Sequence, residues 1–158
     1  MARLAFAVFL LFAIAGCQLI EGSTSDPLCG PMRAFVASVN PNVTREVVFY
    51  TSWGSGFKGE EDETDMWAKR CVHDGYAPAK AVCDSLMQSG AVEFSGHNAT
   101  RTVSCLSKRT RFANRMQLDQ GLFRFNYGTD NRGANVTVSF AEDERLGAMA
   151  LRVTADGY

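Results

Sequence analysis

The sequence predicts an α+β fold, in which a small antiparallel sheet of about five strands carries a two-helix insert on one face and is braced by disulfides. Three observations lead to this prediction. Apolar and polar residues alternate in segments near both ends of the domain, as in strands with one buried face. Apolar residues between these segments follow helical spacing. Three of the four cysteines beyond residue 27 lie in or beside the helical part, so we expect bridges that pin the helices to the sheet and to each other.

The first two strands are expected over Met32–Val39 and Arg45–Trp53. Between them, residues 40–44 read Asn-Pro-Asn-Val-Thr, and this Asn and Pro content suits a turn. In the second strand, Val47 and Trp53 lie on the same face, because side chains alternate with a period of two.

A helical insert is expected next, over Glu63–Asp74 and Pro78–Gln88. The first helix places four residues on one side: Met66, Trp67, Arg70 and Cys71. The second has a proline in its first turn and ends before Gly90. Its apolar residues follow the i, i+3, i+4, i+7, i+8 pattern: Ala79, Val82, Cys83, Leu86 and Met87. Ala91–Phe94 is expected to add a short strand.

The C-terminal third is predicted to be a meander of three strands, over Leu122–Tyr127, Ala134–Phe140 and Ala148–Thr154. Alternate residues of each strand are apolar, and the links between the strands are polar and rich in turn-forming residues. Such strands form an antiparallel sheet that is covered on one side. We expect the helices to provide that cover.

The first 17 residues have the layout of a secretory signal peptide. Arg3 precedes an apolar run, Leu4–Ile14, and small residues then lead to Cys17. The run is too short to cross about 30 Å of hydrocarbon, which takes roughly 20 helical residues. The last four residues of this segment, Ile-Ala-Gly-Cys, resemble the lipobox of bacterial lipoproteins, although leucine is commoner where Ile14 stands. The resemblance covers the leader alone, and the folded domain is assigned to no family.

The lipobox resemblance implies that residues 1–16 are removed, that Cys17 carries a diacylglycerol and that the new N-terminus is acylated. Residues 17–27 would then tether a single globular domain, 28–158, to a membrane. Gln18 follows the cysteine where an Asp would favour the inner membrane, so enterobacterial sorting rules imply the outer membrane and a periplasm-facing domain. The rival outcome is cleavage after Ala15 by a plain signal peptidase, which would release a soluble protein.

The cysteine count agrees with lipidation. The chain has five cysteines, an awkward number in an oxidising compartment. Lipidation of Cys17 leaves an even set that can form two disulfides: Cys29, Cys71, Cys83 and Cys105. Four cysteines allow three pairings, and the sequence does not choose among them.

Charge and motif spacing argue against several function classes. Without Arg3, 15 basic residues stand against 17 acidic ones, and this balance speaks against a nucleic-acid binder. Gly54–Gly59 fits the G-x-G-x-x-G spacing of dinucleotide sites, but the acidic run Glu60–Asp65 follows it, where a pyrophosphate needs attraction. The acidic run instead suits the first turn of a helix, and its spacing does not match a calcium loop. We therefore expect no cofactor and no bound metal.

Two segments are candidate partner-binding surfaces. Lys108–Arg115 concentrates four cations and one aromatic residue in an expected loop, which suits an anionic partner beside a membrane. The simpler interpretation is a solvent-exposed loop whose cations pair with the acidic run. Trp53 and Phe57 flank the glycine-rich segment as candidate interface anchors, although Trp53 also fits the core face that it shares with Val47. The candidate binding residues are Trp53, Phe57, Lys108, Arg109, Arg111 and Arg115.

Two alternatives to a binding protein remain. One is a small secreted enzyme that uses His73 or His97, the only histidines, and such an enzyme would hold one of them in a cleft, hydrogen-bonded to a carboxylate or hydroxyl. No nucleophile elbow of the G-x-S-x-G type occurs. The other is a eukaryotic secreted glycoprotein, because sequons begin at Asn42, Asn98 and Asn135 where chance gives about one.

The favoured interpretation is a lipid-anchored protein of the bacterial cell envelope that faces the periplasm and is not an enzyme. It would act by recognising a protein or an envelope component, in the manner of inhibitor, immunity or assembly lipoproteins.

Overall fold

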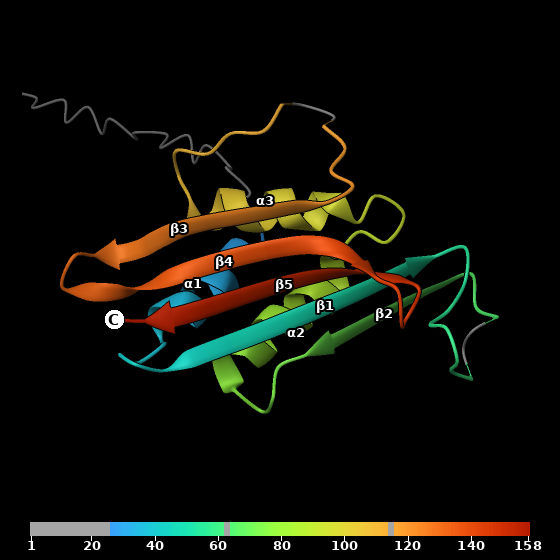
Figure 1. The fold of residues 1–158 in the computed structure, drawn as a ribbon, viewed down its shortest axis with the longest axis horizontal. Coiled ribbons are helices and arrows are strands. Elements are labelled where there is room, and N and C mark those ends of the chain that lie inside the picture. Colours follow the sequence, from blue (N-terminus) through green and yellow to red (C-terminus); the bar gives the residue numbers. More distant parts are fainter. Residues whose placement is uncertain (1–25, 62–63, 114–115) are drawn as a thin grey trace, which may run out of the picture.

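The computed structural model describes residues 26–61, 64–113 and 116–158, and within them the chain forms two layers (Figure 1). One layer is a five-stranded antiparallel sheet, and the other consists of three helices that lie on one side of it. In chain order the elements are α1 (Cys29–Ala37), β1 (Thr44–Trp53), β2 (Trp67–Val72), α2 (Ala77–Ser89), α3 (Gly96–Leu106), β3 (Gly121–Thr129), β4 (Arg132–Asp143) and β5 (Ala148–Gly157). The predicted α+β class is confirmed.

The last strand of the chain lies at the centre of the sheet, whose strand order is β2-β1-β5-β4-β3. β5 pairs with β1 from Met149 opposite Thr51 to Asp156 opposite Thr44, and with β4 on its other side. The first and last strands of the domain are therefore neighbours, and the predicted C-terminal meander β3-β4-β5 is confirmed.

The main core lies between the sheet and the helices. Alternate residues of β4 and β5 face the helices, and seven of them are buried: Ala134, Val136, Val138, Phe140, Leu151, Val153 and Ala155. The helices contribute side chains at helical spacing, including Met32 and Phe35 from α1 and Val82 and Leu86 from α2. Each large apolar side chain removed from water contributes about 1.5–3 kcal/mol, so this interface supplies most of the stability.

Two segments form the opposite element from the one predicted. The strand expected over Met32–Val39 is wrong, because this segment belongs to α1 and its buried residues recur at i, i+3 and i+4. The helix expected over Glu63–Asp74 is also wrong, because β2 forms there and pairs with β1. Trp67 and Cys71 are four residues apart, and residues so spaced share a face in a strand as well as in a helix. The acidic run therefore leads into a strand and caps no helix.

The helix α3 was not predicted, and the short strand expected over Ala91–Phe94 does not form. The buried face of α3 mixes apolar with polar residues, including Asn98 and Thr102, which obscures the apolar pattern. Asn98 is 1% exposed, and its side-chain amide donates to the carbonyl oxygen of Ala91 at 2.7 Å and accepts from the N–H of Ala91 at 2.8 Å. These bonds hold the connection between α2 and α3 as a turn.

Two disulfides join the layers and the helices, as predicted. Cys29 pairs with Cys105, which ties the start of α1 to the end of α3, and Cys71 pairs with Cys83, which ties β2 to α2. The bonds join residues 76 and 12 positions apart. In the chain-entropy model, loops of these lengths stabilise the fold by about 4.5 and about 3 kcal/mol.

A polar junction beside the first disulfide holds the three helices together. Arg101 of α3 donates to both carboxylate oxygens of Asp26 at 2.6 Å and to the carbonyl oxygen of Ser89, at the end of α2, at 3.0 Å. Asp26 also accepts from the N–H of Leu28 at 2.9 Å, at the start of α1. The hydrogen bonds from Arg101 outweigh desolvation and hold the pKa of Asp26 below its ordinary value.

The junction predicts a pH dependence of stability. Because the pKa of Asp26 is lowered in the folded state, its stabilisation is complete above the unfolded pKa of about 4 and is lost as the pH falls through the lower folded pKa. Asp26→Asn should lower the free energy of unfolding by about 2 kcal/mol at pH 7, and the difference from the parent should shrink towards pH 2. Urea titrations at the two pH values measure this difference in the free energy of unfolding.

Asp84→Asn is the control, because the Asp84 pair with Lys80 is an exposed i,i+4 pair and is worth at most about 0.5 kcal/mol. An Asp26→Asn deficit that stays constant from pH 7 to pH 2 would contradict the role given to this carboxylate.

Candidate functional site

The helical layer leaves one end of the sheet uncovered. α2 ends at Ser89, and Gly90 packs so closely against Phe49 that a Cβ atom there would lie 2.8 Å from the ring. Farther along the same face of β1, Thr51 is still buried, whereas Trp53 is 56% exposed. The expectation that Trp53 joins the core is therefore wrong, because the helices stop short of it. The alternative expectation, an exposed aromatic side chain at this position, agrees with the structure.

A second tryptophan lies opposite Trp53. The register of β1 and β2 places Trp67 directly across from it, and Trp67 is 54% exposed. Met66, the residue before β2, is 71% exposed, and its carbonyl oxygen accepts from the N–H of Gly54 at 2.9 Å. We call Trp53, Met66 and Trp67 the tryptophan patch. Tryptophan side chains often dominate the energy of protein interfaces.

Phe57 is buried and cannot act as an exposed anchor. It is 1% exposed and packs in a small cluster on the face of the sheet opposite the helices, with Tyr50 and Leu146 among its members. The guanidinium of Arg70 lies 4.3 Å from the centre of its ring and also pairs with Glu60. The loop after β1 therefore folds back over the sheet, which excludes Phe57 from the candidate site.

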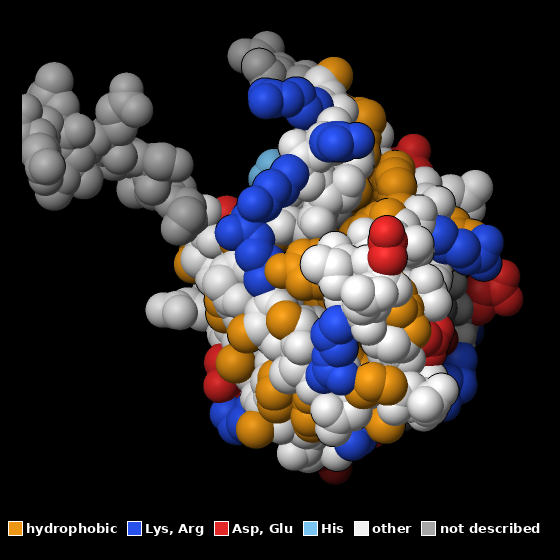
Figure 2. Space-filling view, turned by 90° about the vertical axis from the view of Figure 1, so that its left-hand side faces the viewer, with side chains coloured by type: hydrophobic (Ala, Val, Ile, Leu, Met, Phe, Trp, Pro, Cys, Tyr) orange, Lys and Arg blue, Asp and Glu red, His pale blue; other side chains and the backbone are white. Residues whose placement is uncertain are grey.

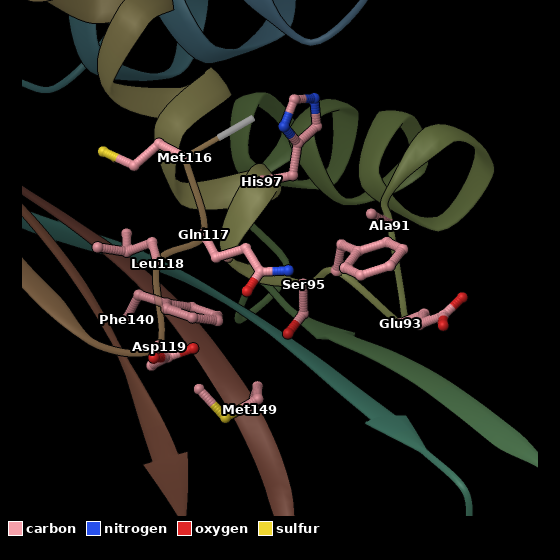
Figure 3. A pocket seen from close by; sticks show the side chains of 12 residues that line it. Ala91, Glu93, Ser95, His97, Met116, Gln117, Leu118, Asp119, Phe140 and Met149 are labelled. Atoms are coloured by element: carbon pink, nitrogen blue, oxygen red, sulfur yellow. The ribbon is translucent and has the colours of Figure 1, made fainter. Parts of the chain in front are cut away.

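An apolar pocket of about 770 Å³ lies on the helix side of the sheet (Figure 3). Its lining comes from the turn between α2 and α3, the start of α3, the segment before β3, and β4 and β5: Ala91, Glu93, Phe94, Ser95, Gly96, His97, Met116, Gln117, Leu118, Asp119, Phe140 and Met149. A pocket of this volume with a mostly apolar lining is typical of small-ligand and side-chain binding sites.

The apolar pocket lies next to the tryptophan patch. Met149 on its floor pairs in register with Thr51, and Trp53 lies two residues farther along β1 on the same face. Strand geometry places the backbones of Met149 and Trp53 about 8 Å apart. Phe94, at the rim, is 60% exposed. The patch and the pocket thus form one surface at the end of the sheet that the helices leave open.

The wall of the apolar pocket depends on a close backbone contact. A Cβ atom at Gly96 would lie 2.0 Å from the carbonyl oxygen of Leu118, so the segment before β3 can approach α3 only because this residue is glycine. Asn98, through its bonds to Ala91, fixes the opposite wall. The sequence analysis noted Asn98 only as the start of a sequon and did not mark Gly96, since neither pattern nor motif reveals a contact between distant segments.

His97 lines the apolar pocket, but its surroundings do not form a catalytic arrangement. Ser95 and Asp119 line the same pocket, so the residue types of a triad come together. Figure 3 shows the imidazole of His97 directed away from Ser95, and the side chains make no hydrogen bond to each other within the described residues. His73 is not in the lining. His97 thus lies in a cleft, as the enzyme alternative requires. Within the described residues, its side chain lacks the hydrogen bond to a carboxylate or hydroxyl that this alternative also requires.

The basic loop between α3 and β3 is the other candidate surface from the sequence. Lys108, Arg109 and Arg111 are exposed and have no ion-pair partner in the described part of the chain, while Arg115 lies outside it. In Figure 2, Lys and Arg side chains lie along the part of the molecule that projects at the top of the view. Within the described residues, no ion pair joins this loop to the acidic run, and Glu60 pairs with Arg70.

The three sequons differ in accessibility. Asn98 is buried with both amide atoms bonded, so the folded chain cannot carry a glycan there. Asn42 and Asn135 are exposed. Burial of one sequon removes part of the excess over chance on which the glycoprotein alternative rests.

In residues 26–61, 64–113 and 116–158, no group of three or more His, Cys, Asp or Glu side chains could hold a metal ion, and no helix is long and apolar enough to cross a membrane. No family model, curated protein or solved structure matches the chain. The function is therefore argued from the geometry of the site.

Substitution of one glycine tests how the pocket is built. Gly96→Ala should lower the free energy of unfolding by about 1–3 kcal/mol, because the added methyl group forces the backbone of residues 116–119 away from α3. Gly30→Ala is the matched control, since Gly30 is also in the first turn of a helix and a Cβ there would meet nothing within 4 Å. The free energy of unfolding of this variant should rise by about 0.4–1 kcal/mol. Urea unfolding followed by circular dichroism compares them, and equal effects would contradict the close contact.

Proposed function

We propose that the protein is a lipid-anchored cell-envelope protein that faces the periplasm and binds a partner through the tryptophan patch and the apolar pocket. The observation that carries the binding role is the exposed pair of opposed tryptophans, Trp53 and Trp67, beside a pocket of about 770 Å³. Soluble domains bury most large aromatic side chains, and an exposed cluster of them usually marks an interaction site.

The rigidity of the surface supports recognition over a structural role. Trp53 and Trp67 lie at the paired ends of β1 and β2, and the disulfide Cys71–Cys83 ties β2 to α2. A preorganised surface loses little conformational entropy on binding, so more of the contact energy appears as affinity.

The cysteine pairing supports the proposed anchor and compartment. The four cysteines beyond residue 27 form two disulfides with each other, which suits an oxidising compartment. Cys17, in the leader and outside the described residues, is the fifth cysteine of the chain. It is thus available for the thioether bond that the lipobox resemblance implies, and acylation at two or more positions holds a protein stably on a membrane.

Site-specific photo-crosslinking tests the binding role. A benzophenone amino acid replaces Trp67 in the full chain, which is produced with its own leader in a Gram-negative bacterium. Leu122 is the matched control position, because it is equally exposed at 54% and lies on β3, at the far edge of the sheet. We expect a crosslinked adduct of one defined mass from position 67, and none from position 122. Trp53→Ser should reduce the adduct at least about fivefold, since a central aromatic residue of an interface contributes 1 kcal/mol or more.

A third position separates the two candidate surfaces. An adduct from Arg109 alone would assign binding to the basic loop and overturn the proposed surface. The absence of an adduct at all three positions would overturn the binding role itself.

A further inference from the structure

We propose that the apolar pocket binds a primary ammonium group carried on an apolar stem. The inference names the ligand chemistry of one part of the surface on which the proposed function rests. It follows from the floor of the pocket, from the charges around it and from the hydroxyl of Ser95, a residue that is 8% exposed.

The floor of the pocket accepts an apolar stem. Phe140 and Met149 come from neighbouring strands of the sheet, and Leu118 lies beside them in Figure 3. Apolar surface removed from water at such a floor contributes about 25 cal/mol per Å². A flat aromatic or short alkyl body of a few carbon atoms suits this space.

Carboxylates surround the pocket without partners of their own. Glu93, from the turn between α2 and α3, and Asp119, from the segment before β3, both line it. Glu142 pairs in register with Met149 and shares its face of the sheet. All three are exposed, and none has an ion pair or side-chain hydrogen bond within the described chain. Their charge favours a cation.

Opposing charges near the pocket are weaker. No Lys or Arg is among the lining residues that the structure describes. The start of α3 also faces the pocket, and the dipole of a helix places roughly half a positive charge at its N-terminus. Three carboxylates outweigh that half charge, so the net preference is for a positive ligand.

The hydroxyl of Ser95 can accept a hydrogen bond from a ligand in the pocket. Ser95 is 8% exposed, and its side chain makes no capping bond to α3 and no other hydrogen bond in the described residues. Figure 3 shows this hydroxyl directed towards the space between Gln117, Phe140 and Met149. A primary ammonium has three N–H donors, so it can donate to Ser95 and to a carboxylate at once, whereas a quaternary ammonium has none.

Methionine methyl groups report binding directly. The full chain, with Cys17→Ser so that no lipid competes, is labelled with ¹³C at the methionine methyl groups and titrated with 3-phenylpropylammonium. Signals of Met116 and Met149, which line the pocket, should shift saturably. The signal of Met87, which is exposed on α2 and lies outside the lining, should not shift. Two probes with the same body, 3-phenylpropanol and 3-phenylpropanoate, isolate the contribution of the ammonium group.

We expect the ammonium probe to bind at least about fivefold more tightly than the alcohol, because two carboxylates act on it, and the carboxylate probe to bind more weakly still. Ser95→Ala should weaken ammonium binding about threefold or more. Glu93→Gln with Asp119→Asn should weaken it about fivefold. Asp130→Asn, in the turn between β3 and β4, is the control and should leave the affinity unchanged. Equal affinity for the three probes, or no saturable shift at Met149, would overturn the inference.

Two sources of the ammonium group are distinguished by a second ligand, the acetylated and amidated tripeptide Phe-Lys-Phe. Shifts at Met149 with this peptide, absent when norleucine replaces its lysine, assign the group to a lysine side chain of a protein partner. Shifts with 3-phenylpropylammonium alone assign it to a small diffusible amine. If neither 3-phenylpropylammonium nor the peptide shifts Met149 while crosslinks from position 67 persist, the ammonium preference is wrong and the proposed binding function still stands.

Discussion

The structure depends on the junction at the start of α1, where the Cys29–Cys105 disulfide and the Asp26–Arg101 pair bring three helices together. The helices span 9, 13 and 11 residues, and isolated helices of that length are marginal in water. They persist because packing on the sheet and these cross-links hold them. The same junction holds α3 against the end of α2, through the bond from Arg101 to the carbonyl oxygen of Ser89, and so positions the turn that walls the apolar pocket.

The helical layer is shorter than the sheet, and this difference creates the proposed binding surface. The strands continue past the end of α2, so Trp53 and Trp67 extend the buried face of the sheet into solvent. The loop after β1 covers the opposite face with Phe57, which keeps that side closed. Only the helix side is therefore left with both exposed aromatic side chains and an apolar pocket within the described chain.

The sequence predicted what local periodicity controls. The alternation of β1, β3, β4 and β5 and the apolar stripe of α2 are repeated patterns, and the structure confirms them. The prediction from periodicity failed in β2, because the spacing of Trp67 and Cys71 fits both a helix and a strand. It also failed in α3, because buried polar residues such as Asn98 interrupt the apolar stripe. The pocket was beyond prediction, because its walls meet through the contact between Gly96 and Leu118, and pairwise contacts between distant segments leave no periodic signal.

The most direct test of an oxidised, membrane-anchored binding domain is the intact mass of the protein, produced with its own leader, extracted from membranes and kept unreduced. We expect a chain that begins at Cys17, is heavier than the polypeptide by a diacylglycerol and an acyl group, and is lighter by four hydrogens because of its two disulfides. A lipid-free chain that begins at Gly16, with an unpaired thiol at Cys17, would contradict the anchor. Free thiols at Cys29 and Cys105 would contradict the junction on which the fold depends.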